Sequence, residues 1–211
     1  MSLLAAPLEL FFKLLYNQFA WCYDWVAAIV SIGRWNDWVS AVIPHLSGTR
    51  ILELGHGPGH LQLRLANHNF RTYGIDASRQ MGRLAYHRLR GSGFSPRLVN
   101  GLGQRLPFVD GVFDQVVATF PSGYIFEAVT LSGIFQVLVP GGTLVVLPYA
   151  WIGRNNILDR LAASVFRITG QAPDWNTRLA EPFIAAGFEI KLIDKHLASS
   201  EVMVIIASRP L

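Results

Sequence analysis

The hydrophobic positions divide the chain into two zones with different periodicities. In residues 1–46 the apolar side chains recur every three or four positions, which is the spacing of one helical face. After Thr49 short apolar runs alternate with helical stretches, and this alternation predicts a parallel sheet with crossover helices. The apolar stripe of the first zone consists of Leu8, Phe11, Leu15, Phe19, Cys22, Val26 and Val30.

The second zone contains enough apolar runs for seven strands. We place them at 51–54, 72–76, 97–99, 113–119, 143–147, 188–194 and 202–208. The helices predicted between them cover 60–68, 78–90, 127–137, 155–169 and 176–186. A turn at 138–142 is expected to precede the fifth strand. The last two strands are separated by too few residues for a crossover, so we expect them to be antiparallel.

Residues 1–46 are expected to form a helical segment in front of a main domain at 47–211, with a second helix at 35–45. Nine of the 25 aromatic residues fall in this segment. Three roles for it stay open: packing on the main domain, a lid over a ligand, and contact with a membrane surface. The membrane role ranks third because such helices are usually rich in Lys and Arg on the polar face, and the helix that carries this stripe has a single lysine, Lys13.

Composition excludes several classes of protein. With 211 residues, 51% of them hydrophobic and 15% charged, the chain is long and apolar enough for one domain with a sizeable core, and it is not a disordered chain. A single cysteine, Cys22, excludes an intrachain disulfide framework and a cysteine-built zinc site. His56 and His60 lack an evident third ligand, so we expect no metal.

The charge pattern argues against a nucleic-acid partner although the formal net charge is +4. The densest basic group, Arg83 to Arg90 with His87, is typical of a solvated helix face. The N-terminus lacks the cationic start of a secretory signal, and no run of 18 uncharged apolar residues predicts a spanning helix. We therefore expect a cytoplasmic protein, with peripheral membrane contact through the N-terminal helix as an alternative.

The most informative segment is Glu53-Leu54-Gly55-His56-Gly57-Pro58-Gly59, which follows a predicted buried strand and precedes a predicted helix. Glycines let the backbone turn tightly and approach a ligand closely, and the helix N-terminus carries a partial positive charge. Asp76 ends the next strand, where a carboxylate can accept hydrogen bonds from both hydroxyls of a ribose. The carboxyl ends of neighbouring strands form the usual ligand crevice of such a sheet.

Two ligands compete for this crevice, a dinucleotide and S-adenosylmethionine. The dinucleotide fingerprint requires a third small residue where this chain has His60, and Glu53 would repel a diphosphate. A carboxylate beside a cationic ammonium group is favourable instead. The segment favours S-adenosylmethionine, and an NAD-dependent oxidoreductase remains the alternative.

The segment ILELGHGPGH at 51–60 resembles the first motif of class I S-adenosylmethionine-dependent methyltransferases. The similarity continues in the family's order through 74–78 with Met81, 101–108, 113–125 and 138–147. The segment YNQFAWCYD at 16–24 is similar to the opening of the ubiquinone/menaquinone-biosynthesis-like branch (methyltransferase type 11). The resemblance implies an α/β fold with a seven-stranded Rossmann-like sheet, its last strand antiparallel, behind an N-terminal helical lid.

The resemblance also implies roles for the residues at matching positions. Glu53 with the backbone of Gly55 and Gly57, in the loop that ends at Gly59, would hold the methionine part of S-adenosylmethionine, and His56 is placed to touch its carboxylate. Asp76 would hold the ribose. The residues implied around the adenine are Ala77, Met81, Gly103 and Gln104. The family often has an aspartate where this chain has Leu102, so the adenine amine would need Gln104, a backbone carbonyl or water.

On the acceptor side the resemblance implies that Thr119 and Phe120 face the sulfonium and the acceptor, and that Tyr16 closes the pocket. Tyr124 is the candidate for a substrate contact or a general base, and aromatic packing under the lid is its alternative. Methyl transfer depends largely on placing the acceptor in line, so no further catalytic group is required. Scarce charge and the aromatic segment suggest a small apolar or amphipathic acceptor such as a quinol, a phenol or a lipid headgroup. A non-catalytic S-adenosylmethionine-binding module stays open.

Overall fold

The computed structural model describes residues 31, 33–152, 179–197 and 200–211. Most of the predicted aromatic segment, including Tyr16, lies outside the described residues, and so does the predicted helix at 155–169. The division into a segment at 1–46 and a domain at 47–211 therefore stays a prediction. No helix in the described part of the chain is long and apolar enough to cross a membrane.

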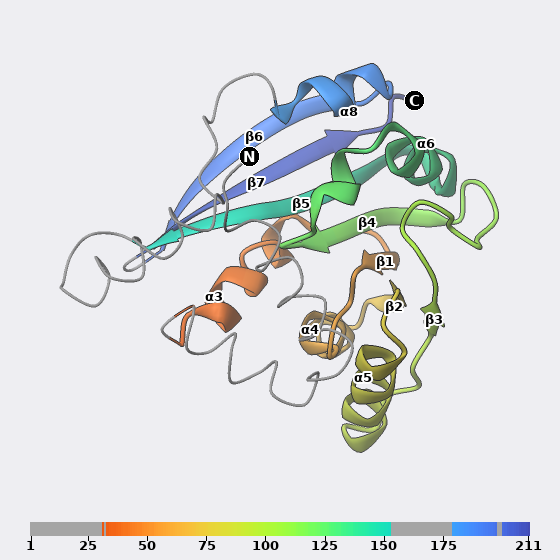
Figure 1. Cartoon of the computed structure of the whole chain (residues 1–211), viewed down its shortest axis with the longest axis vertical. Coiled ribbons are helices and arrows are strands. Elements are labelled where there is room, and N and C mark those ends of the chain that lie inside the picture. Colours follow the sequence, from red (N-terminus) through yellow and green to blue (C-terminus); the bar gives the residue numbers. More distant parts are fainter. Residues whose placement is uncertain (1–30, 32, 153–178, 198–199) are drawn as a thin grey trace, which may run out of the picture.

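Seven strands form one sheet in the order β3-β2-β1-β4-β5-β7-β6 (Figure 1). The five strands from β3 to β5 in this order run parallel, whereas β7 is antiparallel to both β5 and β6. The predicted α/β sheet with an antiparallel last strand is thus confirmed. The strands are β1 (Arg50–Leu54), β2 (Arg71–Asp76), β3 (Leu98–Asn100), β4 (Phe113–Thr119), β5 (Leu138–Ile152), β6 (Glu189–Leu197) and β7 (Ser200–Ser208).

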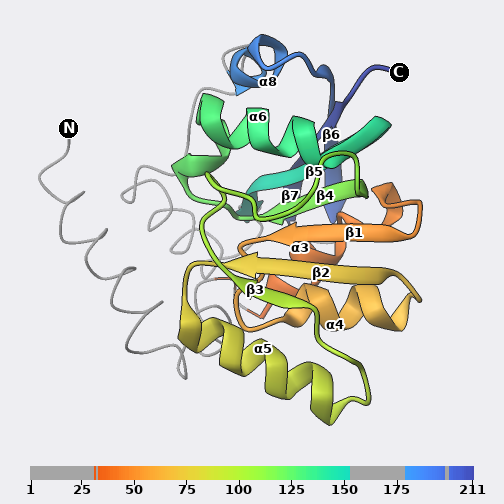
Figure 2. The same ribbon diagram turned by 90° about the vertical axis from the view of Figure 1, so that its right-hand side faces the viewer.

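Helices cover both faces of the sheet, each over its own hydrophobic cluster (Figure 2). On one face α6 and α8 pack over buried strand residues such as Leu52 and Val116, and α8 adds its own Phe183 to this cluster. On the other face α3 and α4 pack over Ile51 and Val117. The described helical segments are α3 (Trp35–Ser40), η2 (Ile43–His45), α4 (His60–Asn67), α5 (Arg79–Gly91), η3 (Gly123–Phe126), α6 (Ala128–Val137) and α8 (Glu181–Ala185).

The turn predicted at 138–142 is wrong, because β5 runs from Leu138 to Ile152 without a break. Gly141 has a φ of 75° and the register with β4 shifts there, so the Pro-Gly-Gly stretch forms an irregularity inside the strand. The N–H of Gly141 donates to the Arg209 carbonyl at 3.0 Å, and the N–H of Arg209 donates to Gly142 at 2.8 Å. This pairing with the chain after β7 keeps the stretch within the sheet.

The helix predicted at 35–45 is interrupted. α3 ends at Ser40, and a separate 3₁₀ turn, η2, covers Ile43–His45. Pro44 explains the break, since it lacks the backbone N–H that would continue the α-helix with a bond to the carbonyl four residues earlier. The side chain of Trp38 on α3 is fully buried, and its indole N–H donates to Ser200 Oγ at 2.9 Å. α3 is therefore tied to the start of β7.

The two edges of the sheet differ in length and composition. β3 has only three residues. β6 has nine residues, and exposed or half-buried side chains of Lys191, Asp194, Lys195 and His196 follow one another along it. His196 Nδ1 lies 3.0 Å from a carboxylate oxygen of Glu201 on β7. The free edge of β6 is thus rich in charge.

Candidate functional site

The glycine loop joins β1 to α4 through left-handed backbone that few side chains tolerate. Gly55, Gly57 and Gly59 have φ values of 67°, 52° and 85°. A methyl group on Gly59 would lie 2.8 Å from Cβ of Ala85 on α5. A glycine is therefore needed at this position for two reasons, the positive φ and the close approach of α5.

Asp76 at the end of β2 fastens this loop to the turn before α5. Its Oδ2 accepts from the N–H of Gly57 at 2.9 Å, and its Oδ1 accepts from the N–H of Ser78 at 2.7 Å. The structure thus brings together Asp76 and the glycine loop, as predicted. Each carboxylate oxygen has a further lone pair, so Asp76 can still accept hydrogen bonds from ribose hydroxyls.

Asn100 is a contributor that the sequence reasoning missed. Its side-chain amide donates to the carbonyls of Asp76 and Ala77, each at 2.9 Å. These bonds fix the turn in which Ala77 is exposed. A signal existed, since Asn100 follows an apolar run at 97–99 and so ends the third strand at the same edge as Asp76.

Glu53 lies in β1 with only 2% of its surface exposed. Its Oε2 accepts a 2.8 Å hydrogen bond from Nε2 of Gln62 on α4. The pKa of Glu53 is raised to about 8, mainly because the carboxyl is buried; the Gln62 hydrogen bond lowers this pKa and the nearby charge of Asp76 adds to the rise. At neutral pH the carboxyl is therefore mostly protonated.

His56 is buried inside the loop. Its Nδ1 lies 2.7 Å from the Gly57 carbonyl oxygen, which can only accept, so Nδ1 carries the proton. Desolvation lowers the pKa of His56, against the opposing effects of Asp76 and the backbone. The ring packs against β2, where a methyl group on Gly74 would lie 2.8 Å from Cδ2 of His56. His56 is therefore a neutral packing group in this structure.

The side chain of Tyr124 on η3 lies between two loops that are predicted to contact the cofactor, the glycine loop and the loop that contains Gly103. A methyl group on Gly103 would lie 2.8 Å from Cε2 of Tyr124, and one on Gly55 would lie 3.1 Å from its hydroxyl oxygen. The ring also packs against the cluster beneath α6. Gln104, next to Gly103, donates from Nε2 to Glu127 at 3.1 Å. The Tyr124 side chain therefore lies close to both the glycine loop and Gly103.

Of the remaining predicted site residues, Met81 lies in the core and Phe120 lies on the side of the sheet that α3 covers. Met81 is fully buried in α5. Thr119 ends β4, and Phe120 follows with a φ of 49°, an uncommon value for a bulky side chain. The Phe120 ring stacks on Trp35 of α3, with centroids 4.6 Å apart and planes at 27°. Phe120 therefore faces α3 rather than Tyr124.

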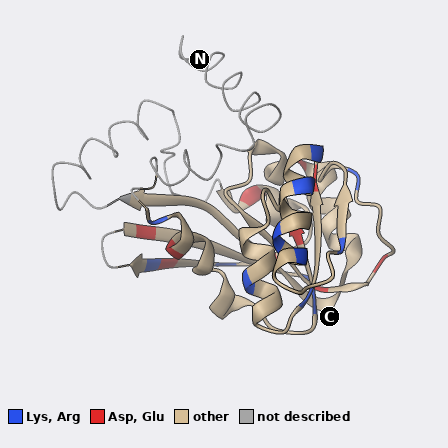
Figure 3. Ribbon diagram, turned by 90° about the horizontal axis from the view of Figure 1, so that it is seen from below, with Lys and Arg blue, Asp and Glu red and all other residues tan. Residues whose placement is uncertain are grey.

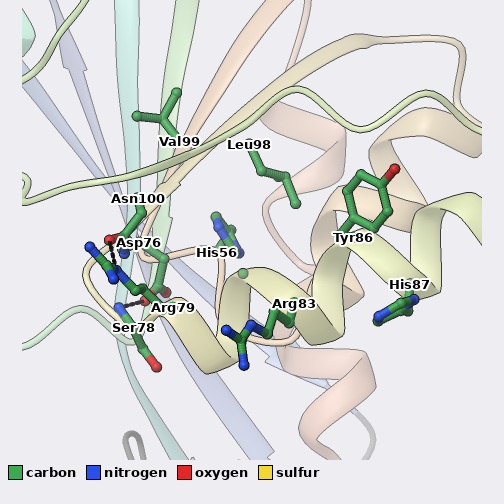
Figure 4. A pocket seen from close by; sticks show the side chains of 11 residues that line it. His56, Asp76, Ser78, Arg79, Arg83, Tyr86, His87, Leu98, Val99 and Asn100 are labelled. Carbon is green, nitrogen blue, oxygen red and sulfur yellow. Dashed lines mark hydrogen bonds between the residues drawn. The ribbon is translucent and has the colours of Figure 1, made fainter.

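A groove of about 480 Å³ lies between α5 and β3 and reaches the site at His56 and Asp76 (Figure 4). Arg79 and Arg83 line it from α5, which lies nearest the viewer in Figure 3 with basic residues on successive turns. Gly103 and Tyr124 are not among its lining residues. Within the described residues, no group of three His, Cys, Asp or Glu side chains is arranged to hold a metal ion.

Residues 51–142 match the model of a family described as "Methyltransferase domain". A putative methyltransferase, YqeM, of Bacillus subtilis is 31% identical over 137 residues, covering 62% of this chain and 54% of that protein. A ubiquinone/menaquinone biosynthesis C-methyltransferase of Wigglesworthia glossinidia brevipalpis is 27% identical over 64% of this chain and 58% of its own length. The chain thus spans little more than half the length of these relatives.

Solved structures share the fold at low sequence identity. A putative S-adenosyl-L-methionine-dependent methyltransferase from Methanococcus maripaludis has a TM-score of 0.66 and 20% identity, covering 93% of this chain and 94% of that one. The YcgJ protein from Bacillus subtilis has a TM-score of 0.64 and 14% identity, covering 83% of this chain and 99% of that one. The arrangement of strands and helices described above is therefore found in both.

Proposed function

Because this chain carries a methyltransferase domain of the class I, S-adenosylmethionine-dependent kind, we propose that it transfers a methyl group from S-adenosylmethionine to a small apolar or amphipathic acceptor. The resemblance predicted from the sequence is confirmed, and so is the methyltransferase class of the domain, and both support S-adenosylmethionine as the proposed cofactor. One observation carries the proposal: the N–H of Gly57 in the glycine loop donates a 2.9 Å hydrogen bond to the Asp76 carboxylate at the end of β2.

The residues present suit this cofactor. Asp76 is a buried acceptor at the strand end, where it would hold the ribose hydroxyls. Glu53 is a buried acid without an ion pair to any described basic residue, and a cationic amino group is what such an acid requires. The backbone of Gly55 and Gly57 would lie along the methionine part, and Ala77, Gly103 and Gln104 would lie at the adenine. When bound, the cofactor supplies an electrophilic methyl group on its sulfonium.

The chain's own contribution to the reaction is positioning. Holding two reactants in line is worth roughly 7–11 kcal/mol of the barrier in favourable cases. Tyr124 would orient the acceptor, or accept its proton where the acceptor loses one early. Its hydroxyl lies beside Gly55, so it is close to the loop that would hold the methionine part.

We propose a quinol-like or phenolic ring as the acceptor, methylated at carbon. Two observations support this choice. Relatives named for ubiquinone and menaquinone biosynthesis match the chain, and the aromatic ring of Tyr124 lies beside the glycine loop. A flat aromatic side chain favours a flat aromatic ligand because rings stack with one another.

The first test is calorimetric titration with S-adenosylhomocysteine, with NAD and NADH as comparators. We expect saturable binding of S-adenosylhomocysteine alone, at least tenfold weaker in Asp76→Ala, because charge-assisted hydrogen bonds to the ribose are lost. Asp110→Ala, at an exposed position in a loop, is the matched control and should bind normally. Binding of a nicotinamide cofactor instead would replace the proposal with the oxidoreductase alternative.

The second test measures methyl transfer to a panel of acceptors. The panel pairs demethylmenaquinol and simple phenols with the polar amines histamine and phosphoethanolamine. Transfer to the ring compounds supports the proposed acceptor, whereas transfer only to the polar amines would overturn it. Binding of S-adenosylhomocysteine without transfer to any acceptor of the panel would favour a non-catalytic binding module.

A further inference from the structure

Glu53 lies in the middle of the sheet, and none of the described residues supplies a counter-ion for it. It pairs in register with Gly74 of β2 and Val117 of β4, on the face covered by α4. No lysine or arginine in the described part of the chain makes an ion pair with it. A buried carboxylate without a cation is costly, so the group stays neutral until a cation arrives.

Gln62 fixes the position of this acid from the first turns of α4. Its Nε2 donates both hydrogens, one to Glu53 Oε2 at 2.8 Å and one to the Tyr73 carbonyl at 3.0 Å. Because the carbonyl can only accept, the orientation of the amide is determined. The amide oxygen Oε1 of Gln62 is buried and has no hydrogen-bond partner among the described residues. Gln62 thus leaves its own Oε1 unsatisfied among the described residues while its Nε2 holds the Glu53 carboxyl.

Few other groups near Glu53 can titrate. Asp76 lies at the end of β2 and its negative charge opposes a second carboxylate. His56, in the loop, has a pKa lowered by burial and is neutral. α4 contributes the neutral Gln62, and the neighbouring strand β4 contributes the apolar Val117, which pairs with Glu53 in register. No neighbour described here replaces the missing cation.

We propose that the Glu53–Gln62 pair couples binding of the cofactor's ammonium group to the release of one proton. This inference rests on the proposed function, since it assumes a ligand with an α-ammonium group. The Glu53 carboxyl loses its O–H proton to solvent, the ammonium keeps its three protons, and a neutral acid becomes one half of an ion pair. Gln62 is a positioning residue, because its hydrogen bond favours the ionised form of Glu53.

The test is calorimetric titration of the full chain at pH 6.0 to 7.0 in buffers of different ionisation enthalpy. In this range an α-amino group, with an ordinary pKa of about 7.7–8.0, stays mostly protonated. We expect S-adenosylhomocysteine to release close to one proton and to bind about tenfold more tightly for each unit of rising pH. The comparison ligand is 5′-methylthioadenosine, which lacks the ammonium and should bind with no proton release.

Two variants separate positioning from structure. Glu53→Gln should abolish proton release and weaken S-adenosylhomocysteine about tenfold or more, while 5′-methylthioadenosine binds as before. Gln62→Met should move the rise in affinity to higher pH, because the hydrogen bond that lowers the pKa of Glu53 is lost. Asn67→Ala, at an exposed position on the same helix, should behave as the wild type.

The outcomes distinguish this inference from the proposed function. Failure of both adenosine ligands to bind at any pH contradicts the proposed function itself. Binding of S-adenosylhomocysteine with no proton release overturns only the coupling. A Gln62→Met variant that weakens both ligands equally at every pH overturns the positioning role of Gln62.

Discussion

Gly103 and Tyr124 show how the absence of one methyl group shapes the candidate site. The Tyr124 ring lies where a side chain on Gly103 would be, with 2.8 Å between Cε2 and the expected Cβ. We expect Gly103→Ala to displace the ring and to weaken S-adenosylhomocysteine binding by roughly tenfold, the effect of about 1.4 kcal/mol of strain. Calorimetric titration measures this change directly.

The control is Gly123→Ala, one residue before Tyr124. A methyl group there meets no atom within 4 Å, so binding should stay within about twofold of the wild type. Equal binding by the two variants would show that the position of the Tyr124 ring does not matter for the ligand.

Glu53 also gives the protein without ligand a characteristic dependence on pH. Burial raises its pKa from the ordinary 4.5 to about 8 in the fold. A raised pKa means that the contribution to stability is complete below the unfolded value and is lost as the pH rises towards the folded value. We expect the melting temperature to fall between pH 5.5 and 8, and to fall less in Glu53→Gln.

Glu181→Gln, at an exposed position on α8, is the control for this series. Its melting temperatures should follow those of the wild type at every pH. A Glu53→Gln variant with the same slope as the wild type would mean that the burial of Glu53 does not govern the pH dependence.

The sequence predicted those site residues whose backbone conformation or strand position has a local signature. The glycine loop and Asp76 are of this kind. Gln62 and Asn100 were missed because their roles depend on what lies across from them. A glutamine early in a helix is usually exposed, and only the packing of α4 on β1 places Gln62 beside Glu53.

At the scale of elements, α3 and β7 are joined by a single buried hydrogen bond between Trp38 and Ser200. We expect Trp38→Phe to lower the free energy of unfolding by about 1–3 kcal/mol, since the Ser200 hydroxyl loses its partner and the smaller ring leaves a void. Chemical denaturation measures the change. Asn36→Ala, at an exposed position on α3, should have little effect, and a similar loss in both variants would contradict the role of the buried bond.

Element prediction succeeded where a local pattern coincided with the long-range pairing. The run at 113–119 became β4 with the same bounds. It failed at 138–142, where Pro-Gly-Gly is typical of a turn but hydrogen bonds with the backbone of Arg209 keep the stretch in the sheet. Those bonds join positions far apart in the sequence, so no local pattern contains them.

At the scale of the whole molecule, ligand binding and folding are linked through the central strands. A ligand held by β1, β2 and their loops binds only the folded chain. At one hundred times its dissociation constant such a ligand adds about 2.7 kcal/mol of stability. We expect S-adenosylhomocysteine to raise the melting temperature by roughly 5–10 °C, and NAD at equal concentration to leave it unchanged, as thermal denaturation would show.

The charged edge of β6 has a consequence for the behaviour of the protein in solution. An open sheet edge is a template on which another chain can add a strand, and natural proteins prevent this with short strands or with charge. β3 is short, so the protection of β6 depends on Lys191, Asp194, Lys195 and their neighbours. Because salt screens exposed charges beyond about 10 Å at 0.1 M, we expect this protection against strand addition to weaken as the ionic strength rises.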